Sequence, residues 1–449
     1  MAKELTKDMT KGTPWKLIMA FFIPLLVGNC FQQLYNIIDS IVVGKGINDE
    51  ALAAVGATGS LHFFIFGFVI GLTSGISILI SQAYGAQDME RLRKVISMSL
   101  IVSIVLIVVF TIVCVWQLTP LLEIMKTPKG VIMEQAKAYM NIILYGLFAT
   151  IFYNYLAGLL RALGDSKTPL LAMILSTVVN VVLDLFFILV LHMGVEGAAY
   201  ATVIAQIFTV VFCFIKVRKI TFIKLKREDF TMNGKVIGEI LKIGLPVGFM
   251  NSITAVGFMV LQYFVNGLGE TYTAAYSVGT KIFTFVEQPS AALGLAVTTY
   301  AGQNLGANKI RRIKTGVYST LFISVIMNLG IGLVMVLIPD ILARIMVSKP
   351  ENIRLASEFI PIGGYGLIFL SVLFTFRGAC QGMGHTVVPM ISGILELALR
   401  VFIVLAIGSR FGMLGIGLTE ISAWFGAGAM LMGYFVWVLR VKMRNYVEV

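Results

Sequence analysis

Charged residues are scarce in this 449-residue chain: Asp, Glu, Lys and Arg make up 13% of it, about half of their usual share in soluble domains. Hydrophobic residues make up 58%. This composition excludes a soluble globular protein and indicates a polytopic membrane protein. The net charge of +12 could suit nucleic acid, but the Lys and Arg lie in short loops between apolar runs, which is the pattern that orients a membrane protein. We therefore expect a lipid bilayer partner and no nucleic acid.

Cysteine and histidine are also rare, with four and three residues. Cys30, Cys114, Cys213 and Cys380 lie in or beside apolar segments, and their spacing fits no metal site. The sequence contains no HExxH, no Gly-x-Ser-x-Gly and no cluster of His and Asp. We therefore expect no enzymatic activity, no structural metal and no cofactor, and an intramembrane enzyme remains only the alternative from a different class.

Long apolar runs are what the chain has in abundance. A membrane-spanning helix needs roughly 20 apolar residues, and the sequence predicts an all-α protein with twelve of them. They lie at 17–43, 52–84, 95–116, 138–160, 169–192, 198–217, 243–265, 274–303, 315–338, 356–378, 387–407 and 414–439. The strongest polar break is a basic linker, 218–242, which divides an N-lobe (1–217) from a C-lobe (243–449), each with six helices.

The basic loops predict the orientation. Arg91, Arg93 and Lys94 follow the second span, and Lys309, Arg311, Arg312 and Lys314 follow the eighth. These loops and the basic linker fall on one side under alternating topology. The positive-inside rule then places both termini in the cytoplasm of a multi-pass protein of the plasma or inner membrane.

The two halves repeat short motifs in the same order. Residues 24–28 match 246–248, residues 81–86 match 302–307, and residues 161–169 match 377–389. Because each half has six spans, both halves insert in the same sense, as in transporters with parallel repeats. The alternative is an old duplication without transport.

A polar face interrupts the first apolar run. Gln32, Tyr35, Asn36 and Asp39 recur at three- and four-residue spacing, so they share one side of a helix. An aspartate near the bilayer centre costs on the order of 3 kcal/mol, so it usually faces a cavity or a partner. Pro24 removes a backbone hydrogen bond and gives this helix a place to bend.

A second polar group lies in the fifth and sixth spans. Asn180 and Asp184 are four residues apart on one face, and Thr202 follows Ala198 by one turn. Counted from the predicted cytoplasmic side, Asp39, Asp184 and Thr202 all fall in the outer half of the N-lobe. Two carboxylates, an amide, a hydroxyl and a carbonyl would suit a shared proton or a bare monovalent cation. The alternative is independent hydrogen bonds that pack helices.

The C-lobe has a different set of charges. No acid lies in 246–265; Lys281 and Glu287 lie in the eighth span, and Glu396 and Arg400 form a four-residue pair in the eleventh. These four residues could form a structural ion-pair network or contact the substrate, and the sequence leaves both alternatives open. Met259 and Phe283 are weak candidates for soft, tolerant cavity contacts.

These motifs resemble the MATE (multidrug and toxic compound extrusion) transporters over nearly the whole chain. The resemblance rests on the order of several motifs: 33–44, 53–56, 82–86, 161–169, 180–184, 197–199 and 302–307. It implies two six-helix lobes in a V with a central cavity, and export of cationic amphipathic compounds in exchange for H+ or Na+. Because a two-lobed cavity needs no partner chain, we expect a monomer.

The resemblance also implies roles for individual residues. The family's cation site would fall on Asp39, Asn180, Asp184, Thr202 and the carbonyl of Ala198, and its bending point on Pro24. Tyr35, Tyr139 and Asn154 would line the N-lobe cavity. Asn36 and Glu287 are further weak candidates for the substrate cavity, from the residues alone. This chain lacks the helix-7 glutamate of the Na+-driven NorM-like members, which puts a C-lobe Na+ site in doubt and favours the DinF-like or MepA-like branch.

The predicted mechanism is antiport by alternating access. Ion uptake would neutralise Asp39 and Asp184, helix 1 would relax at Pro24, and the cationic substrate would leave outward. Within transport, the alternative is a lipid-linked oligosaccharide flippase of the same superfamily. Such a flippase would carry more cations in its cavity, and only Lys281 and Arg400 lie in mid-span here.

Overall fold

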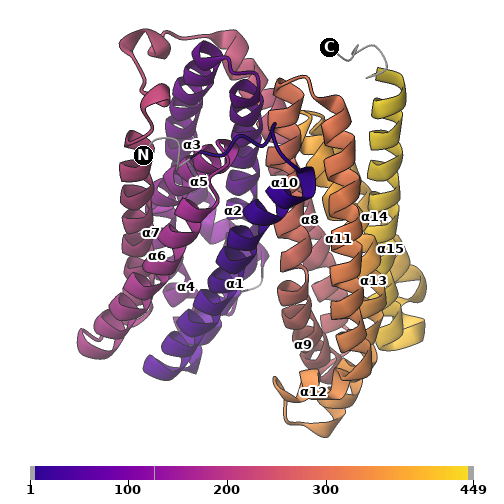
Figure 1. Cartoon of the computed structure of the whole chain (residues 1–449). Coiled ribbons are helices and arrows are strands. Elements are labelled where there is room, and N and C mark those ends of the chain that lie inside the picture. The colour runs from indigo at the N-terminus through magenta and orange to yellow at the C-terminus, as the bar shows by residue number, and fades with distance from the viewer. Residues whose placement is uncertain (1–5, 126, 443–449) are drawn as a thin grey trace. The chain divides into compact units, whose positions relative to one another are not determined.

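The computed structural model describes residues 6–125 and 127–442, apart from the side chains of Asp49, Ser60, Ser409 and Lys442. Within this part of the chain the protein is all helical and has no strand (Figure 1). The extreme ends of the two predicted lobes, 1–5 and 443–449, lie outside the described residues.

The helices follow one another with short connections. In the first half they are α1 (Pro14–Gly46), α2 (Asp49–Gly85), α3 (Met89–Ile124), α4 (Val131–Tyr145), α5 (Leu147–Ala162), α6 (Lys167–Leu185) and α7 (Gly194–Arg218). In the second half they are α8 (Gly234–Asn266), α9 (Glu270–Val286), α10 (Gln288–Gly306), α11 (Ile310–Leu337), α12 (Pro339–Arg344), α13 (Pro350–Gly382), α14 (Val387–Ile403) and α15 (Ser409–Trp437). Short π-helical turns extend α6 (Phe186–Val190), α14 (Val404–Gly408) and α15 (Val438–Lys442).

Ten of the described helices are long and apolar enough to cross a membrane, and the pair α4–α5, bent by 46°, raises the number to eleven. These eleven coincide with eleven of the twelve predicted spans. The predicted eighth span, 274–303, consists of two helices, α9 and α10, that fall outside this set. Most of α10 is buried, including Ser290, Gln303 and Asn304. Its polar side chains face other protein residues, so α10 does not need an apolar surface toward lipid.

Contacts group the chain into two compact units. The first contains Ile23–Leu245 with the described part of Met1–Asp8, and the second contains Met9–Phe22 with Pro246–Val449. Each division inside a helix lies next to a proline, Pro24 in α1 and Pro246 in α8. A proline inside a helix removes one backbone hydrogen bond. Both long helices are therefore weakest where the chain passes from one unit to the other.

The first unit is built around α7 and α2. Helix α7 packs against α4, α5 and α6, and α2 packs against α3, α4 and α5. Buried apolar side chains such as Leu61 and Ile143 form one core cluster, and a second cluster contains Leu72 and Leu160. The turn between α6 and α7 is short, so the two helices are antiparallel neighbours. This arrangement brings polar residues of α6 close to those of α7.

The second unit is built around α13, which packs against α9, α10, α11, α14 and α15. Glycines allow some of these helices to approach closely. A Cβ atom at Gly378 of α13 would lie 2.2 Å from the carbonyl oxygen of Gly294 in α10. A Cβ at Gly332 of α11 would lie 2.6 Å from the carbonyl oxygen of Gly364 in α13. Small residues at such crossings are what allows helices to associate without a hydrophobic driving force.

We expect Gly378→Ala to destabilise the protein, because its methyl group would overlap the α10 backbone. Forcing extra volume into a packed site typically costs about 1–3 kcal/mol. Gly330 of α11 provides the matched control, since a Cβ there would meet nothing within 4 Å. Alanine is also the better helix former, so Gly330→Ala should leave stability unchanged or raise it by up to about 1 kcal/mol. Thermal unfolding of the two purified variants checks this, and equal midpoints would contradict it.

Candidate functional site

Two aspartates from separate helices meet in the first unit. Asp39 of α1 and Asp184 of α6 are within side-chain hydrogen-bonding range of each other. Asp184 is fully buried. Two carboxylates can only accept hydrogen bonds, so their contact becomes a hydrogen bond only when one of them carries a proton. The two acids predicted from the sequence therefore lie beside each other, and their role as an ion or proton site stays a prediction.

Several polar atoms around these acids lack protein partners. Asp39 Oδ1, both carboxylate oxygens of Asp184 and both amide atoms of Asn180 are buried, and none of them has a conventional hydrogen bond from the described residues. Buried polar groups in proteins are nearly always satisfied, so each exception calls for an explanation. A group of five such atoms on α1 and α6 suits a site whose hydrogen-bonding partner is an ion, a proton or water.

Helix α7 supplies the third side of the site. The hydroxyl groups of Thr202 and Tyr35 are 3.1 Å apart and hydrogen bonded, which links α7 to α1. Ala198 is fully buried one turn before Thr202. Tyr139 of α4 is buried and lies within electrostatic range of Asp39, Tyr35 and Asp184. The roles of these residues in ion binding stay predictions.

Two other predicted residues lie apart from the acid pair. Asn36 is exposed on α1; its amide donates to Gln33 Oε1 at 3.4 Å, and its carbonyl accepts from Ser40. Asn154 of α5 donates to the carbonyl oxygen of Thr150, 2.9 Å away. The structure thus brings together Asp39, Tyr35, Asp184, Thr202 and Tyr139, with Asn180 one turn before Asp184 on α6. Asn36 and Asn154 form local hydrogen bonds in their own helices.

Local features at both ends of α6 define where this helix begins and ends. Asp165 Oδ1 accepts hydrogen bonds from the N–H groups of Lys167 and Thr168, both 3.0 Å away, and so fixes the start of α6. At the other end of α6, the π-helical turn and Gly194, with a φ of +62°, reverse the chain into α7. Glycine suits this turn because it adopts positive φ without a steric penalty.

Three candidates of the second unit, Glu287, Glu396 and Arg400, come together, and the others are described one by one. Phe283 is buried in an aromatic cluster, with its ring centroid 5.0 Å from that of Phe359 and 6.5 Å from that of Trp424. Lys281 is exposed and has no ion pair among the described residues. Met259 is half-buried. Glu287 lies at the junction of α9 and α10, within electrostatic range of Glu420, Arg400 and Glu396.

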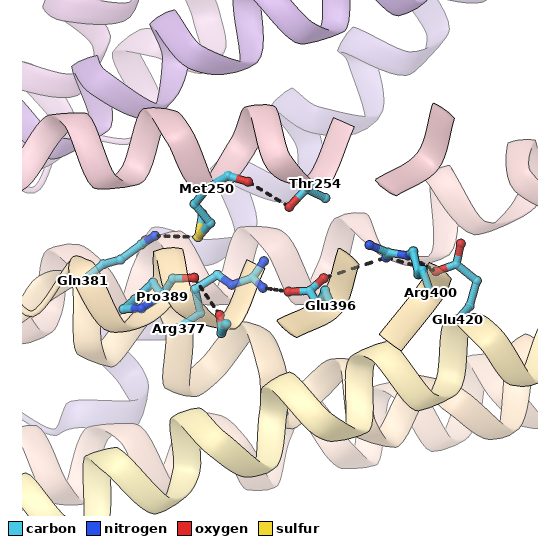
Figure 2. A network of polar contacts seen from close by, with 9 residues as sticks. Met250, Thr254, Arg377, Gln381, Pro389, Glu396, Arg400 and Glu420 are labelled. Carbon is cyan, nitrogen blue, oxygen red and sulfur yellow. Dashed lines mark hydrogen bonds and ion pairs between the residues drawn. The ribbon is translucent and has the colours of Figure 1, made fainter. Parts of the chain in front are cut away.

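Glu396 and Arg400 belong to a larger buried network than the sequence predicted (Figure 2). Their mutual contact is 3.8 Å, but each has a closer partner. Glu396 accepts a hydrogen bond from Arg377 of α13, and Arg400 binds Glu420 of α15 through Nε at 3.1 Å and Nη2 at 3.0 Å. The sequence analysis missed Arg377 and Glu420 as members of this network. Their position inside apolar runs was the signal that could have identified them.

Comparisons with known proteins give one consistent result. The MatE family profile matches residues 24–186 and 246–406. The chain is 28% identical over 453 residues to "Probable multidrug resistance protein YoeA" of Bacillus subtilis (strain 168), covering 98% of this chain and 97% of that protein. It is 24% identical over 412 residues to "Multidrug export protein MepA" of Staphylococcus haemolyticus (strain JCSC1435), covering 90% and 89%. A crystal structure of "MATE in the bent conformation" superposes with a TM-score of 0.90 at 26% identity, over 100% of this chain and 99% of that one.

We expect the neutral variant Asp184→Asn to be more stable than the unmodified protein. Its amide can donate to Asp39, and it removes a buried charge that has no donor, a change typically worth about 1–3 kcal/mol. Asp165 provides the contrast within the same unit, because it already accepts two backbone hydrogen bonds. Asp165→Ala should lose about 1 kcal/mol. Thermal unfolding at neutral pH measures whether each variant gains or loses stability. A larger loss of stability in Asp184→Asn than in Asp165→Ala would mean that the acid pair holds the fold together.

Proposed function

The chain belongs to the MATE family of transporters, and from that premise we propose that it is a multidrug exporter driven by an ion gradient. The observation that carries the proposal is the pairing of Asp39 and Asp184 beside the unsatisfied amide of Asn180. Oxygen ligands of this kind suit a proton shared between two acids or a bare monovalent cation. Secondary antiport of H+ or Na+ against the drug is the function that this chemistry supports best.

The coupling step follows from the charge of the acid pair. With both carboxylates ionised, like charges lie close together in a site with few donors, and this state favours uptake of a cation or a proton. Uptake lowers the negative charge of the site and so weakens its attraction for a cationic substrate. Binding of one is thereby linked to release of the other, which is what exchange requires.

Helix α1 is well suited to convert the change in charge at the acid pair into a movement. It carries Asp39 and Tyr35 on the site side of Pro24, and it passes from one unit to the other next to this proline. Neutralising Asp39 removes its repulsion with Asp184 of α6, and a protonated Asp39 can donate a hydrogen bond to that carboxylate, which draws α1 toward α6. The Tyr35–Thr202 hydrogen bond holds the same part of α1 to α7. We propose that α1 then bends at Pro24, where a backbone hydrogen bond is already missing.

Cationic amphipathic compounds are the proposed substrates. The relatives named for multidrug resistance and multidrug export support breadth rather than one ligand. Aromatic and thioether side chains accommodate varied apolar cations through cation–π and dispersion contacts. Tyr35 and Tyr139 already lie beside the acid pair, whereas a substrate role for Asn36, Asn154, Met259, Phe283 or Glu287 rests on the sequence alone.

We further propose that the protein acts as a monomer in the plasma or inner membrane, with both termini in the cytoplasm. The multi-pass character rests on the apolar helices. The orientation rests on the basic loops, such as the one after α10 with Lys309, Arg311 and Arg312, which the positive-inside rule assigns to the cytoplasm.

Drug efflux from vesicles under an imposed gradient tests the proposal. A fluorescent cationic dye is followed first under a pH gradient and then under a Na+ gradient. We expect Asp39→Asn to lower efflux to the rate of vesicles without the protein, because a neutral amide cannot take up a proton and lacks the negative charge that attracts a cation. Efflux driven by the pH gradient alone would identify a proton antiporter, and a requirement for Na+ would identify a cation site.

Glu134→Gln is the matched control, since Glu134 is an exposed acid of the same unit that pairs only with Lys137, 3.7 Å away. This variant should transport at the unmodified rate. Normal efflux by Asp39→Asn would refute the coupling role, and absence of efflux from the unmodified protein under either gradient would redirect the assignment to a lipid-linked oligosaccharide flippase.

A further inference from the structure

The second unit repeats the residue spacing of the first, counted from matching prolines and glycines, but carries different side chains at the corresponding positions. Pro24 is followed by Asn29, and Pro246 is followed at the same spacing by Asn251. Counted from these prolines, Tyr35 of α1 corresponds to Gly257 of α8. In the same way Asn36 corresponds to Phe258 and Asp39 corresponds to Leu261.

Helices α6 and α14 extend the correspondence. Each follows a glycine of positive φ, Gly164 at +87° and Gly384 at +81°, and each contains a proline five residues later. Counted from Pro169 and Pro389, Asn180 corresponds to Arg400, and Asp184 corresponds to Val404.

Helices α7 and α15 complete the correspondence between the two units. Gly194 and Gly412 both have positive φ, +62° and +55°. Eight residues after them come Thr202 and Glu420 respectively. Since Thr202 contacts Tyr35 in the first unit, Glu420 and Gly257 are expected to flank one location in the second unit.

The substitutions between the units form a consistent set. Both acids of the first unit become buried apolar residues in the second, Leu261 and Val404. The neutral amide becomes the cation Arg400, and the neutral hydroxyl becomes the anion Glu420. The second unit has thus lost the ligands of a mobile cation and has gained a fixed ion pair in the corresponding place.

The contacts of Arg400 show that its guanidinium fills the position that corresponds to the polar site of the first unit. The side chain is 1% exposed. Glu420 binds it through two nitrogens, and the ring of Phe258 lies beneath it with its centroid 4.8 Å from Cζ. A Cβ atom at Gly257 would lie 3.0 Å from Nη1. Glycine at position 257 therefore leaves the room that the guanidinium occupies, where the first unit has a tyrosine.

We propose that Arg400 is a resident cation of the second unit, occupying the position at which the first unit takes up its mobile coupling ion. The comparison with a coupling ion rests on the proposed function, whereas the guanidinium site rests on the second unit alone. Arg400 then acts as a specificity-determining residue, because its permanent charge keeps other cations out and confines ion coupling to the acids of the first unit.

Charge balance in the second unit supports this role. Arg377 and Arg400 face Glu396 and Glu420, so the four side chains are neutral as a group (Figure 2). Glu287 adds a further acid within electrostatic range of Arg400. Removing the Arg400 side chain would leave a buried excess of carboxylate next to a vacated, guanidinium-sized space. Such a space should bind guanidinium ion from solution.

Chemical rescue of Arg400→Ala tests the proposal. The full-length variant is purified, and its thermal unfolding is measured with millimolar guanidinium chloride, with NaCl at equal ionic strength and without added salt. We expect a lowered midpoint, of which guanidinium restores about half or more by binding the folded state. NaCl should restore less, because Na+ lacks the planar donors that match two carboxylates.

Arg354→Ala is the matched control, since Arg354 lies in the same unit in an exposed pair with Glu358, 3.4 Å away. Its midpoint should not respond to guanidinium, and neither should that of the unmodified protein. A response in Arg354→Ala equal to that in Arg400→Ala, or no specific response in Arg400→Ala, would overturn the proposal.

A charge-neutral double variant keeps the test decisive if Arg400→Ala does not fold. Arg400→Gln and Glu420→Gln are compared singly and together. If Arg400 serves as the cation for Glu420, the double variant recovers much of the loss of the singles. Additive losses, or a double variant that fails to fold where a single one folds, would overturn the proposal. These readouts involve no transport, so they stand apart from the loss of efflux expected in Asp39→Asn.

Discussion

A charge inside an apolar protein must have a partner, and this constraint governs the polar interior of both units. Taking an ion out of water costs several kcal/mol after relaxation, and it is repaid only by good geometry and further hydrogen bonds. The second unit meets the constraint with protein groups alone, since Glu396 and Glu420 each bind an arginine. In the first unit the side-chain polar atoms of Asp184 and Asn180 have no conventional hydrogen bond among the described residues, and the partner that we propose for them is an ion, a proton or water.

That difference gives the two units different capabilities. The buried ion pairs hold α13, α14 and α15 in one arrangement, because separating these helices would leave buried charges unpaired. An unsatisfied group of acids has at least two states that differ by a bound ion, and its neighbours can change with it. In the first unit the proposed ion site includes Asp39 of α1, the helix that also contains Pro24. The proposed site of ion uptake and the weak point of the backbone therefore lie on the same helix.

Some of the candidate site could be predicted because its residues share one helix. The four-residue spacing of Asn180 and Asp184 places them on one face of α6 whatever surrounds that helix. The Glu396–Arg400 pair was recognisable for the same reason. Arg377 and Glu420 were missed because their partners lie on other helices, and no spacing within a helix encodes such a pair. Phe283 shows the limit of such reasoning, since an aromatic residue in a span fits a cavity and a packed core equally well, and only the structure shows that it packs against Phe359.

The sequence by itself determined the class of the protein, its apolar helices, its repeated halves and the short list of costly polar residues within them. These follow from composition and from the period of the helix, which are local properties. The tertiary structure alone decided which of those residues meet: Asp39 with Asp184, Tyr35 with Thr202, and Arg400 with Glu420. It also decided that α9 and α10 are separate and that α10 is buried. The reason is physical, because contacts between helices depend on how whole faces pack, and side chains far apart in the chain set that packing together.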